Sequence, residues 1–273
     1  NTLIGNSGND VIHGREGSDS LDGGIGNDTI NGGIDADIIL GGTGNDNLQG
    51  DAGNDTINAD DGDDTVSGGE GNDTFYAGNG VDTLYYANSE SGITYTLVNN
   101  TSDASGNFAT VSSISDGDDI LKTHFERLIA TNYADTIDLR NTVAGNSTIL
   151  GYGGADIIYS STSYGDTIYG GDANDIIHAN GGSNSYYGGN ATLDVNGNIT
   201  GSSASGDDRV SYLLATSGIN VDLSVTATST VNNVILNGFG GQDKLYNITR
   251  ITASNYADVI KASSGWNALC GQN

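Results

Sequence analysis

A nine-residue period runs through the first third of the chain and constrains its fold more than any other feature. The stretch GGIGNDTINGGIDADIILGGTGNDNLQ, residues 23–49, places Asp28, Asp37 and Asp46 nine residues apart, and each is followed two positions later by Ile or Leu. When Asp is set at position six of the unit, positions one and four are mostly Gly and position eight is apolar. Such a period is typical of a protein in which each unit packs on its neighbours.

The residue types within one unit predict its local structure. Three residues around position eight, such as those at 29–31, can form a short β-strand whose central Ile30 points inward. The other six residues are rich in Gly, which permits tight turns that other side chains would obstruct. Two units then form one coil, and coils stack at about 4.8 Å, the distance between neighbouring strands. The sequence therefore predicts an all-β fold with a narrow aliphatic core.

The stacked Asp residues indicate a metal. Carboxylates about 5 Å apart repel by roughly 3 kcal/mol at an effective dielectric constant near 20, whereas burial of one aliphatic side chain returns only about 2 kcal/mol. A hard divalent cation between the turns would reverse this repulsion, and Ca²⁺ fits because it accepts six to eight oxygen ligands in flexible geometry. The competing interpretation, that Asp and Gly merely favour turns in a repetitive linker, does not account for the unbroken spacing. We expect multiple Ca²⁺ ions, about seven in the first block if each gap between stacked Asp residues binds one.

The repeat resembles the glycine-rich nonapeptide of the RTX (repeats-in-toxin) calcium-binding proteins. The segments GGIGNDTIN (23–31) and GGTGNDNLQ (41–49) match that pattern closely, and the resemblance extends over residues 5–85. It returns less regularly in GYGGADIIY (151–159) and GGDANDIIH (170–178). The resemblance implies a right-handed parallel β-roll (RTX) that binds calcium.

Two longer segments interrupt the period and resemble each other. Residues 82–98 parallel 208–225, and residues 119–138 parallel 243–261. These copies resemble an element that is interleaved with RTX units, in which the chain leaves the roll and re-enters it through a YAD unit. We therefore expect two interrupting extended β elements, which widen the coil.

The expected organisation and calcium ligands follow from this register. The predicted parts are a regular RTX β-roll block at 1–85, an interrupting β element at 86–146, a second β-roll block at 147–190, a hairpin insertion with an Asn-Gly turn at 191–207, and a second interrupting element with re-entry repeats at 208–273, all within one continuous solenoid. The candidate metal ligands are the Asp residues at position six: Asp10, Asp19, Asp28, Asp37, Asp46, Asp55, Asp64, Asp73, Asp82, Asp135, Asp156, Asp166, Asp175 and Asp258.

The sequence supports further predictions for several residues outside the list of Asp ligands. Asn184 takes position six as a neutral side chain and is expected to bind calcium less well than Asp. His13 and His178 fall at position nine, where we expect strand-surface residues and not metal ligands. Tyr169 and Tyr187 are predicted neighbours on one face, so stacking against sugar rings is an open alternative to simple strand preference.

Composition excludes some classes of partner. The formal net charge of −27, from 35 acidic and 8 basic residues, argues against nucleic acid, because phosphate contacts need Lys and Arg. Cys270 is the single cysteine, which rules out an internal disulfide framework. No apolar run is long enough to span a membrane, so no membrane insertion is expected. Both ends of the sequence fall within a repeat, and we expect a fragment of a longer array.

These observations favour a structural function. No HExxH or GxSxG motif occurs, and we expect no enzymatic activity. Metal binding coupled to folding predicts a chain that stays extended at low calcium and folds in high-calcium surroundings, and the resemblance implies type I secretion. We expect a secreted or cell-surface module of a bacterial S-layer protein or adhesin, which self-associates into a surface array or binds cell-surface polysaccharide. The alternatives are the secretion and folding module of an RTX enzyme or toxin, with its catalytic domain outside this chain, and a glycan-binding module.

Overall fold

The computed structural model describes residues 1–97, 107–140, 145–193, 199–202, 206–222, 233–261 and 268–270. Strands and turns make up all of these residues, which confirms the all-β prediction. Within the described ranges there is accordingly no helix that could cross a membrane. The chain divides into two compact units, unit 1 over residues 1–129 and unit 2 over residues 130–273. The block boundaries expected from the sequence remain predictions.

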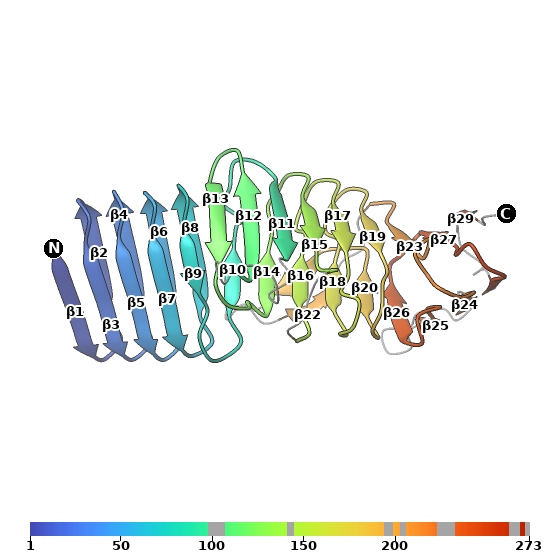
Figure 1. The fold of residues 1–273 in the computed structure, drawn as a ribbon, viewed down its shortest axis with the longest axis horizontal. Helices are drawn as coiled ribbons and strands as arrows, with labels where there is room; N and C mark the ends of the chain where they lie inside the picture. Colours follow the sequence, from blue (N-terminus) through green and yellow to red (C-terminus); the bar gives the residue numbers. More distant parts are fainter. Residues whose placement is uncertain are drawn as a thin grey trace. The chain divides into compact units, whose positions relative to one another are not determined.

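Unit 1 consists of two sheets whose strands alternate along the chain (Figure 1). One sheet contains β1 (Thr2–Ser7), β3 (Ser20–Ile25), β5 (Ile38–Thr43), β7 (Thr56–Asp61) and β9 (Thr74–Tyr76), followed by β13 (Gly117–Leu121), β12 (Ala109–Ser113) and β11 (Ile93–Leu97). The other contains β2 (Val11–Glu16), β4 (Thr29–Ile34), β6 (Asn47–Ala52), β8 (Thr65–Glu70), β10 (Thr83–Tyr85) and β14 (Arg127–Ile129). Parallel pairing brings Leu21 opposite Ile39 and Ile39 opposite Ile57. Two nine-residue units therefore make one coil, as predicted.

The first interrupting element extends one of these sheets. After β10 the chain forms β11, β12 and β13, which pair with one another antiparallel. Strand β13 then pairs parallel with β9, so that Leu121 lies opposite Phe75. The chain thus leaves the nine-residue period and returns to it in register.

Unit 2 has the same design with shorter strands. Its first sheet contains β15 (Thr136–Asp138), β17 (Ile157–Tyr159), β19 (Ile176–His178), β23 (Arg209–Ser211), β27 (Arg250–Thr252) and β29 (Ala268–Cys270). Its second contains β16 (Thr148–Leu150), β18 (Thr167–Tyr169), β20 (Ser185–Tyr187), β26 (Gln242–Tyr246), β25 (Asn233–Leu236), β24 (Asn220–Asp222) and β28 (Val259–Lys261). Strands β24, β25 and β26 pair antiparallel, which repeats the arrangement of β11, β12 and β13.

A separate hairpin leaves unit 2. It pairs β21 (Ala191–Leu193) antiparallel with β22 (Ile199–Ser202). The Asn-Gly turn expected at 196–197 lies outside the described residues.

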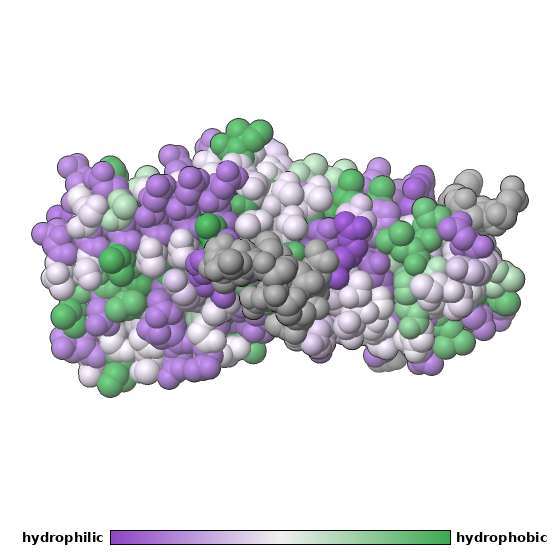
Figure 2. All heavy atoms as spheres, viewed as in Figure 1, coloured by the Kyte–Doolittle hydropathy of each residue, from purple (hydrophilic) through white to green (hydrophobic). Residues whose placement is uncertain are grey.

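The core of unit 1 is a stack of single side chains at position eight. Leu21, Ile39, Ile57 and Phe75 are all 0% exposed. Each such burial stabilises the coil by about 2 kcal/mol. On the outer face, Figure 2 shows mainly hydrophilic side chains over the strands of unit 1, with single apolar ones between them. The fold therefore places one apolar residue per unit inside and sets the position-six Asp residues at the turns.

Candidate metal centre

The position-six Asp residues of unit 1 form two ladders, one along each edge of the stacked coils. In each ladder, the Oδ1 atom of one Asp accepts the backbone N–H of the Asp one coil earlier. Asp28 Oδ1 accepts from Asp10 at 2.7 Å, and Asp37 Oδ1 accepts from Asp19 at 2.7 Å. The ladders contain Asp10, Asp28, Asp46, Asp64 and Asp82 on one edge, and Asp19, Asp37, Asp55, Asp73 and Asp119 on the other. At one end Glu126 Oε2 continues the first ladder by accepting the N–H of Asp82 at 2.9 Å.

Unit 2 contains a ladder of the same kind. Asp156, Asp175 and Asp208 each accept the N–H of the preceding member through Oδ1, at 2.9, 2.9 and 3.0 Å. The first donor in this series is the backbone N–H of Asp135.

The second carboxylate oxygen of most ladder members has no donor. Among the described residues, eight Asp side chains of unit 1 and three of unit 2 have a buried Oδ2 atom without a hydrogen-bond partner. They are Asp10, Asp19, Asp28, Asp37, Asp46, Asp55, Asp64, Asp73, Asp156, Asp175 and Asp208. Burial of a charged oxygen without a partner costs several kcal/mol. A row of such atoms therefore fits a bound cation.

Glycine at position one makes room beside most of these oxygens, whereas Asp64 has Ala59 at that position. A Cβ atom added to Gly5 would lie 2.6 Å from Asp10 Oδ2 and 2.5 Å from the carbonyl oxygen of Gly23. At Gly41 the corresponding distances, to Asp46 Oδ2 and the carbonyl oxygen of Ala59, are both 2.6 Å. The space that Gly leaves open is thus bordered by a carboxylate oxygen and a backbone carbonyl oxygen. Hard cations such as Ca²⁺ prefer oxygen ligands of these two kinds.

Burial also changes the protonation of the ladder. Loss of hydration raises the pKa of Asp64 to about 7 and that of Asp73 to about 8. The N–H bonds oppose this rise, and repulsion from the stacked carboxylates adds to it. Burial likewise raises the pKa of Asp156 to about 10. Without metal, Asp73 and Asp156 therefore retain a proton at neutral pH and Asp64 does so in part, and a cation bound there would replace those protons.

The comparison with protein families decides what this arrangement is. Residues 1–30, 31–66, 58–88, 142–162 and 160–191 match the family model of the RTX calcium-binding nonapeptide repeat, and together these segments cover half of the chain. The chain belongs to the RTX family. Its repeats are accordingly calcium-binding, and its stacked parallel coils are the β-roll that the sequence predicts. No curated protein matches the sequence.

One solved structure with a partial likeness is the crystal structure of the extracellular lipase LipA from Serratia marcescens. The two chains are 19% identical with a TM-score of 0.25, and the match covers 86% of this RTX chain and 38% of the lipase chain. The chain therefore spans well under half the length of that protein.

Three Asp residues expected to be ligands are held by donors from their own turns. The Thr131 N–H donates to Asp135 Oδ2 at 3.0 Å, and its hydroxyl donates to Asp135 Oδ1 at 2.9 Å. The Ser161 N–H donates to Asp166 Oδ2 at 2.7 Å. In a third RTX turn the hydroxyl of Ser254 donates to Asp258 Oδ1 at 2.6 Å. These side chains differ from the ladder members whose Oδ2 atoms have no donor, and their role as ligands remains a prediction.

Sequence reasoning missed three members of the stacks, Asp119, Asp208 and Asp243. Each of them has Gly two residues earlier and an apolar residue two residues later, as a regular RTX unit has. The segment GFGGQDKLY (238–246) even matches the nonapeptide at every defining position. The loss of period after Asp82 concealed this signal.

Asn184 takes the place of a ladder Asp between Asp166 and Asp243, and each such position in a stack is termed a rung. Its Oδ1 accepts the N–H of Asp166 at 2.8 Å, and its amide donates to the Gly181 carbonyl oxygen at 3.0 Å. The N–H of Asn184 in turn donates to Asp243 Oδ1 at 2.9 Å. A neutral amide donor thus lies where most ladder Asp residues have a carboxylate oxygen without a donor. Weaker calcium binding by Asn184 remains a prediction.

The position-nine residues lie on the strand surface. His13 is exposed, and His178 stacks on Tyr159 with ring centroids 4.5 Å apart. Tyr169 and Tyr187 are neighbours as expected, stacked at 4.3 Å, and Tyr246 covers the next face of Tyr187 at 4.0 Å. In the described part of the chain no three His, Cys, Asp or Glu side chains converge on one point.

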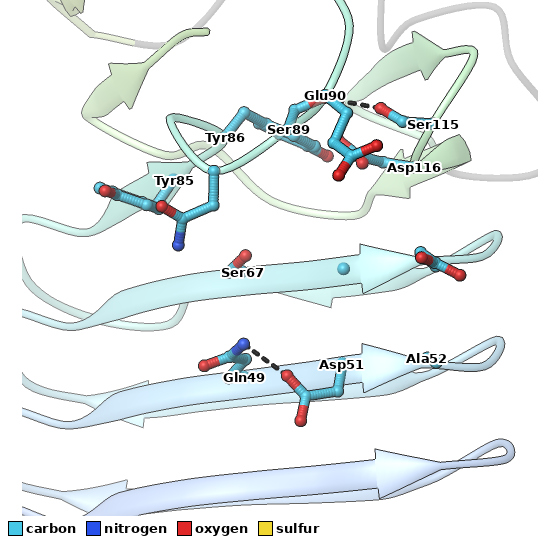
Figure 3. A pocket seen from close by; sticks show the side chains of 13 residues that line it. Gln49, Asp51, Ala52, Ser67, Tyr85, Tyr86, Ser89, Glu90, Ser115 and Asp116 are labelled. Atoms are coloured by element: carbon cyan, nitrogen blue, oxygen red, sulfur yellow. Dashed lines mark hydrogen bonds between the residues drawn. The ribbon is translucent and has the colours of Figure 1, made fainter.

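A polar pocket of about 330 Å³ lies in unit 1 beside β6 and β8 (Figure 3). Its lining includes the ring of Tyr85, the amides of Gln49 and Asn88, and the carboxylates of Glu90 and Asp116. The pocket is distinct from the regular turns, because its residues come from the strand surface and from the interrupting element.

Proposed function

We propose that the Asp residues whose Oδ2 atoms have no donor hold Ca²⁺ ions between successive turns. The observation that carries this proposal is the row of buried, donor-free Oδ2 atoms beside position-one glycines, in a chain whose repeats belong to a calcium-binding family. The bound cation would neutralise the stacked carboxylates, while Gly at position one leaves carbonyl oxygens within reach.

Calcium binding of this kind couples the metal to folding. With a net charge of −27 and one buried apolar residue per unit, the chain has little to hold its coils together without the metal. We propose that it remains extended inside the cell, is secreted by a type I system, and folds in the calcium-rich surroundings of a bacterial cell.

For the parent protein we propose a structural role at the cell surface, in an S-layer or an adhesin. The support is the regular stacking of coils within each unit, since each coil buries its neighbour's apolar residue and yields a continuous core. The alternative is a secretion and folding module of an RTX enzyme or toxin. In that case a catalytic domain would lie outside the chain.

The test is a titration of CaCl₂ into EDTA-stripped protein, followed by far-UV circular dichroism and light scattering, with MgCl₂ as the control. A cooperative transition to β structure with calcium alone supports the proposal, and growth of large assemblies in the same range favours an S-layer. Full β structure in EDTA that calcium does not alter would overturn the coupling of metal to folding.

The pocket in unit 1 favours a second candidate function, binding of a glycan. A sugar ring can pack against an aromatic ring while its hydroxyls bond to amides and carboxylates, and Tyr85, Gln49, Asn88, Glu90 and Asp116 supply these groups around one pocket (Figure 3).

The stacked tyrosines of unit 2 are poorer candidates, because their faces cover one another. Retention on a glycan array that Tyr85→Ala abolishes and Tyr76→Ala preserves would support this function. Tyr76 is a matched control because it also ends a strand at position nine and is 38% exposed. Equal retention of both variants, or none by the unmodified chain, would exclude it.

A further inference from the structure

Two buried tyrosines bond to Asp side chains at position six. The Tyr86 hydroxyl donates to Asp119 Oδ2 at 2.5 Å, and the Tyr212 hydroxyl donates to Asp243 Oδ2 at 3.0 Å. Tyr86 is 4% exposed and Tyr212 is 0% exposed, and the two carboxylates are equally buried. Both phenols therefore lie inside the unit to which they belong, with their hydroxyl groups at the turns.

Both acids also accept a backbone N–H through Oδ1, as the regular ladder members do, and Asp243 Oδ1 accepts in addition the side-chain amide of Asn237 at 3.0 Å. Asp119 Oδ1 accepts the N–H of Asp73 at 2.8 Å, and Asp243 Oδ1 accepts the N–H of Asn184 at 2.9 Å. In the regular rungs Asp55 and Asp73, the Oδ2 atom is buried and has no donor among the described residues. At Asp119 and Asp243 the tyrosine hydroxyl contacts the oxygen that elsewhere is left for the cation.

The two pairs occupy equivalent positions in the duplicated elements. Tyr86 and Tyr212 are each four residues after the Asp that opens the parallel segments 82–98 and 208–225. The residues around them differ, since the acidic and amide groups near Tyr86 correspond to apolar or small residues near Tyr212. The corresponding residues are Asn88 and Leu214, Glu90 and Thr216, and Asp116 and Gly240. The Tyr–Asp hydrogen bond is thus common to both interrupting elements, whereas the acidic and amide lining of the unit 1 pocket is particular to the first element.

A phenol satisfies a carboxylate in a different way from a metal. The phenol brings its own proton and needs no ion from solution. It keeps that proton near neutral pH, because the ordinary pKa of a tyrosine is about 10. A hydrogen bond from a neutral donor to a buried carboxylate removes the penalty of leaving that oxygen unpaired.

We propose that Tyr86 and Tyr212 close the Asp119 and Asp243 turns to calcium and hold them folded without the metal. The two interrupting elements would then be metal-independent parts of a calcium-dependent roll. In unit 1 this part consists of β11, β12 and β13, and in unit 2 of β24, β25 and β26. The inference rests on the proposed calcium binding by the other rungs.

The first test counts bound calcium by native mass spectrometry in three chains, unmodified, Asp119→Asn and Asp55→Asn. We expect Asp119→Asn to retain the full number of ions and Asp55→Asn to lose at least one. Loss of an ion from Asp119→Asn would overturn the inference, because Asp119 would then be a ligand. Absence of calcium from the unmodified chain would instead refute the proposed function itself.

The second test measures backbone hydrogen exchange in EDTA. In the unmodified chain we expect β11–β13 to remain protected while β5 and β7 exchange rapidly. Tyr86→Phe keeps the ring but leaves the Asp119 oxygen without its donor, and it should speed exchange in β11–β13 by roughly 5- to 150-fold. Tyr95→Phe, which removes another buried hydroxyl of the same element, is the control and should leave this bond intact. Equal exchange of β11–β13 and β5 in unmodified protein, or no change in Tyr86→Phe, would overturn the inference.

Discussion

Replacement of Asp55 by Asn should change stability in opposite directions with and without calcium. Asp55 Oδ1 accepts the N–H of Asp37 at 2.8 Å, and Asn retains this acceptor. The Oδ2 atom, which is buried and has no donor, becomes an uncharged amide. Burial and repulsion from Asp37 raise the pKa of Asp55 to about 6, against an opposing effect of the N–H bond. The substitution therefore removes an unfavourable charge from the metal-free fold.

The magnitudes follow from the spacing of the rungs. Two charges about 5 Å apart at an effective dielectric constant of 20 repel by about 3 kcal/mol, and solvent screening reduces this. In EDTA, Asp55→Asn should therefore raise the free energy of unfolding by about 1–3 kcal/mol. With calcium at about 100 times its Kd, each site stabilises the fold by about 2.7 kcal/mol. Because Asp55 borders two gaps of its ladder, the variant should lose about 5 kcal/mol of calcium stabilisation. After the gain of about 1–3 kcal/mol in the metal-free fold, the net loss in calcium should be about 2–4 kcal/mol.

In CaCl₂ the assay is urea unfolding followed by circular dichroism. In EDTA, where the chain is expected to be largely extended, the assay measures how much of a stabilising osmolyte (TMAO) is needed to induce β structure. Asp61→Asn is the matched control, because it removes the same charge at an exposed turn and keeps the oxygen that accepts from Asn79. It should change stability little in either condition. If Asp55→Asn shifts stability in the same direction in both conditions, or behaves as Asp61→Asn does, the assignment of Asp55 to calcium is wrong.

Three further predictions follow from the ladders and the core. Gly41→Ala brings a Cβ within 2.6 Å of two oxygens and should weaken calcium binding in a calorimetric titration, whereas Gly153→Ala, whose nearest neighbour is 3.5 Å away, should not. Without calcium, the raised pKa of Asp73 means that the folded state holds a proton that the unfolded state releases above about pH 4. Metal-free stability should therefore be highest at or below about pH 4 and fall as the pH rises towards about 8. The osmolyte concentration that folds the chain in EDTA at several pH values can check this, as part of the unfolding assay described above. Phe75→Ala empties a fully buried core position and should cost about 3–5 kcal/mol in the same assay with calcium, compared with about 0.5 kcal/mol or less for Tyr76→Ala.

The regular half of the fold was predictable because its period couples three independent signals. Around Ile39, for example, Gly at the turn, Asp at position six and an apolar residue at position eight all recur with the same spacing. The paired strands and the buried stack follow from that register alone. The ladder geometry was less accessible, because nothing in the sequence states that Oδ1 bonds to the neighbouring backbone while Oδ2 is left free.

The irregular half was harder to predict, because its stacks join residues that are far apart in sequence. Asp73 bonds to Asp119, which lies 46 residues later, and Asn184 bonds to Asp243, which lies 59 residues later. A search at a spacing of nine cannot find such partners. Nor could it show that Thr131 supplies Asp135 with donors from within its own turn, since that depends on how the turn folds back.

The hydrogen bonds of the Asp ladders all point one way along unit 1. The carboxylate that accepts the N–H of Asp28 belongs to Asp46, one coil nearer the C-terminus. A coil is therefore complete only after its C-terminal neighbour is in place. Side chains at position five bond in the opposite sense, because Asn9 Oδ1 accepts the N–H of Asn27 at 2.9 Å, one coil later, and Asn27 Oδ1 accepts that of Asn45. Each coil therefore depends on both of its neighbours, and a roll cut at either end leaves some of its side-chain donors and acceptors without partners.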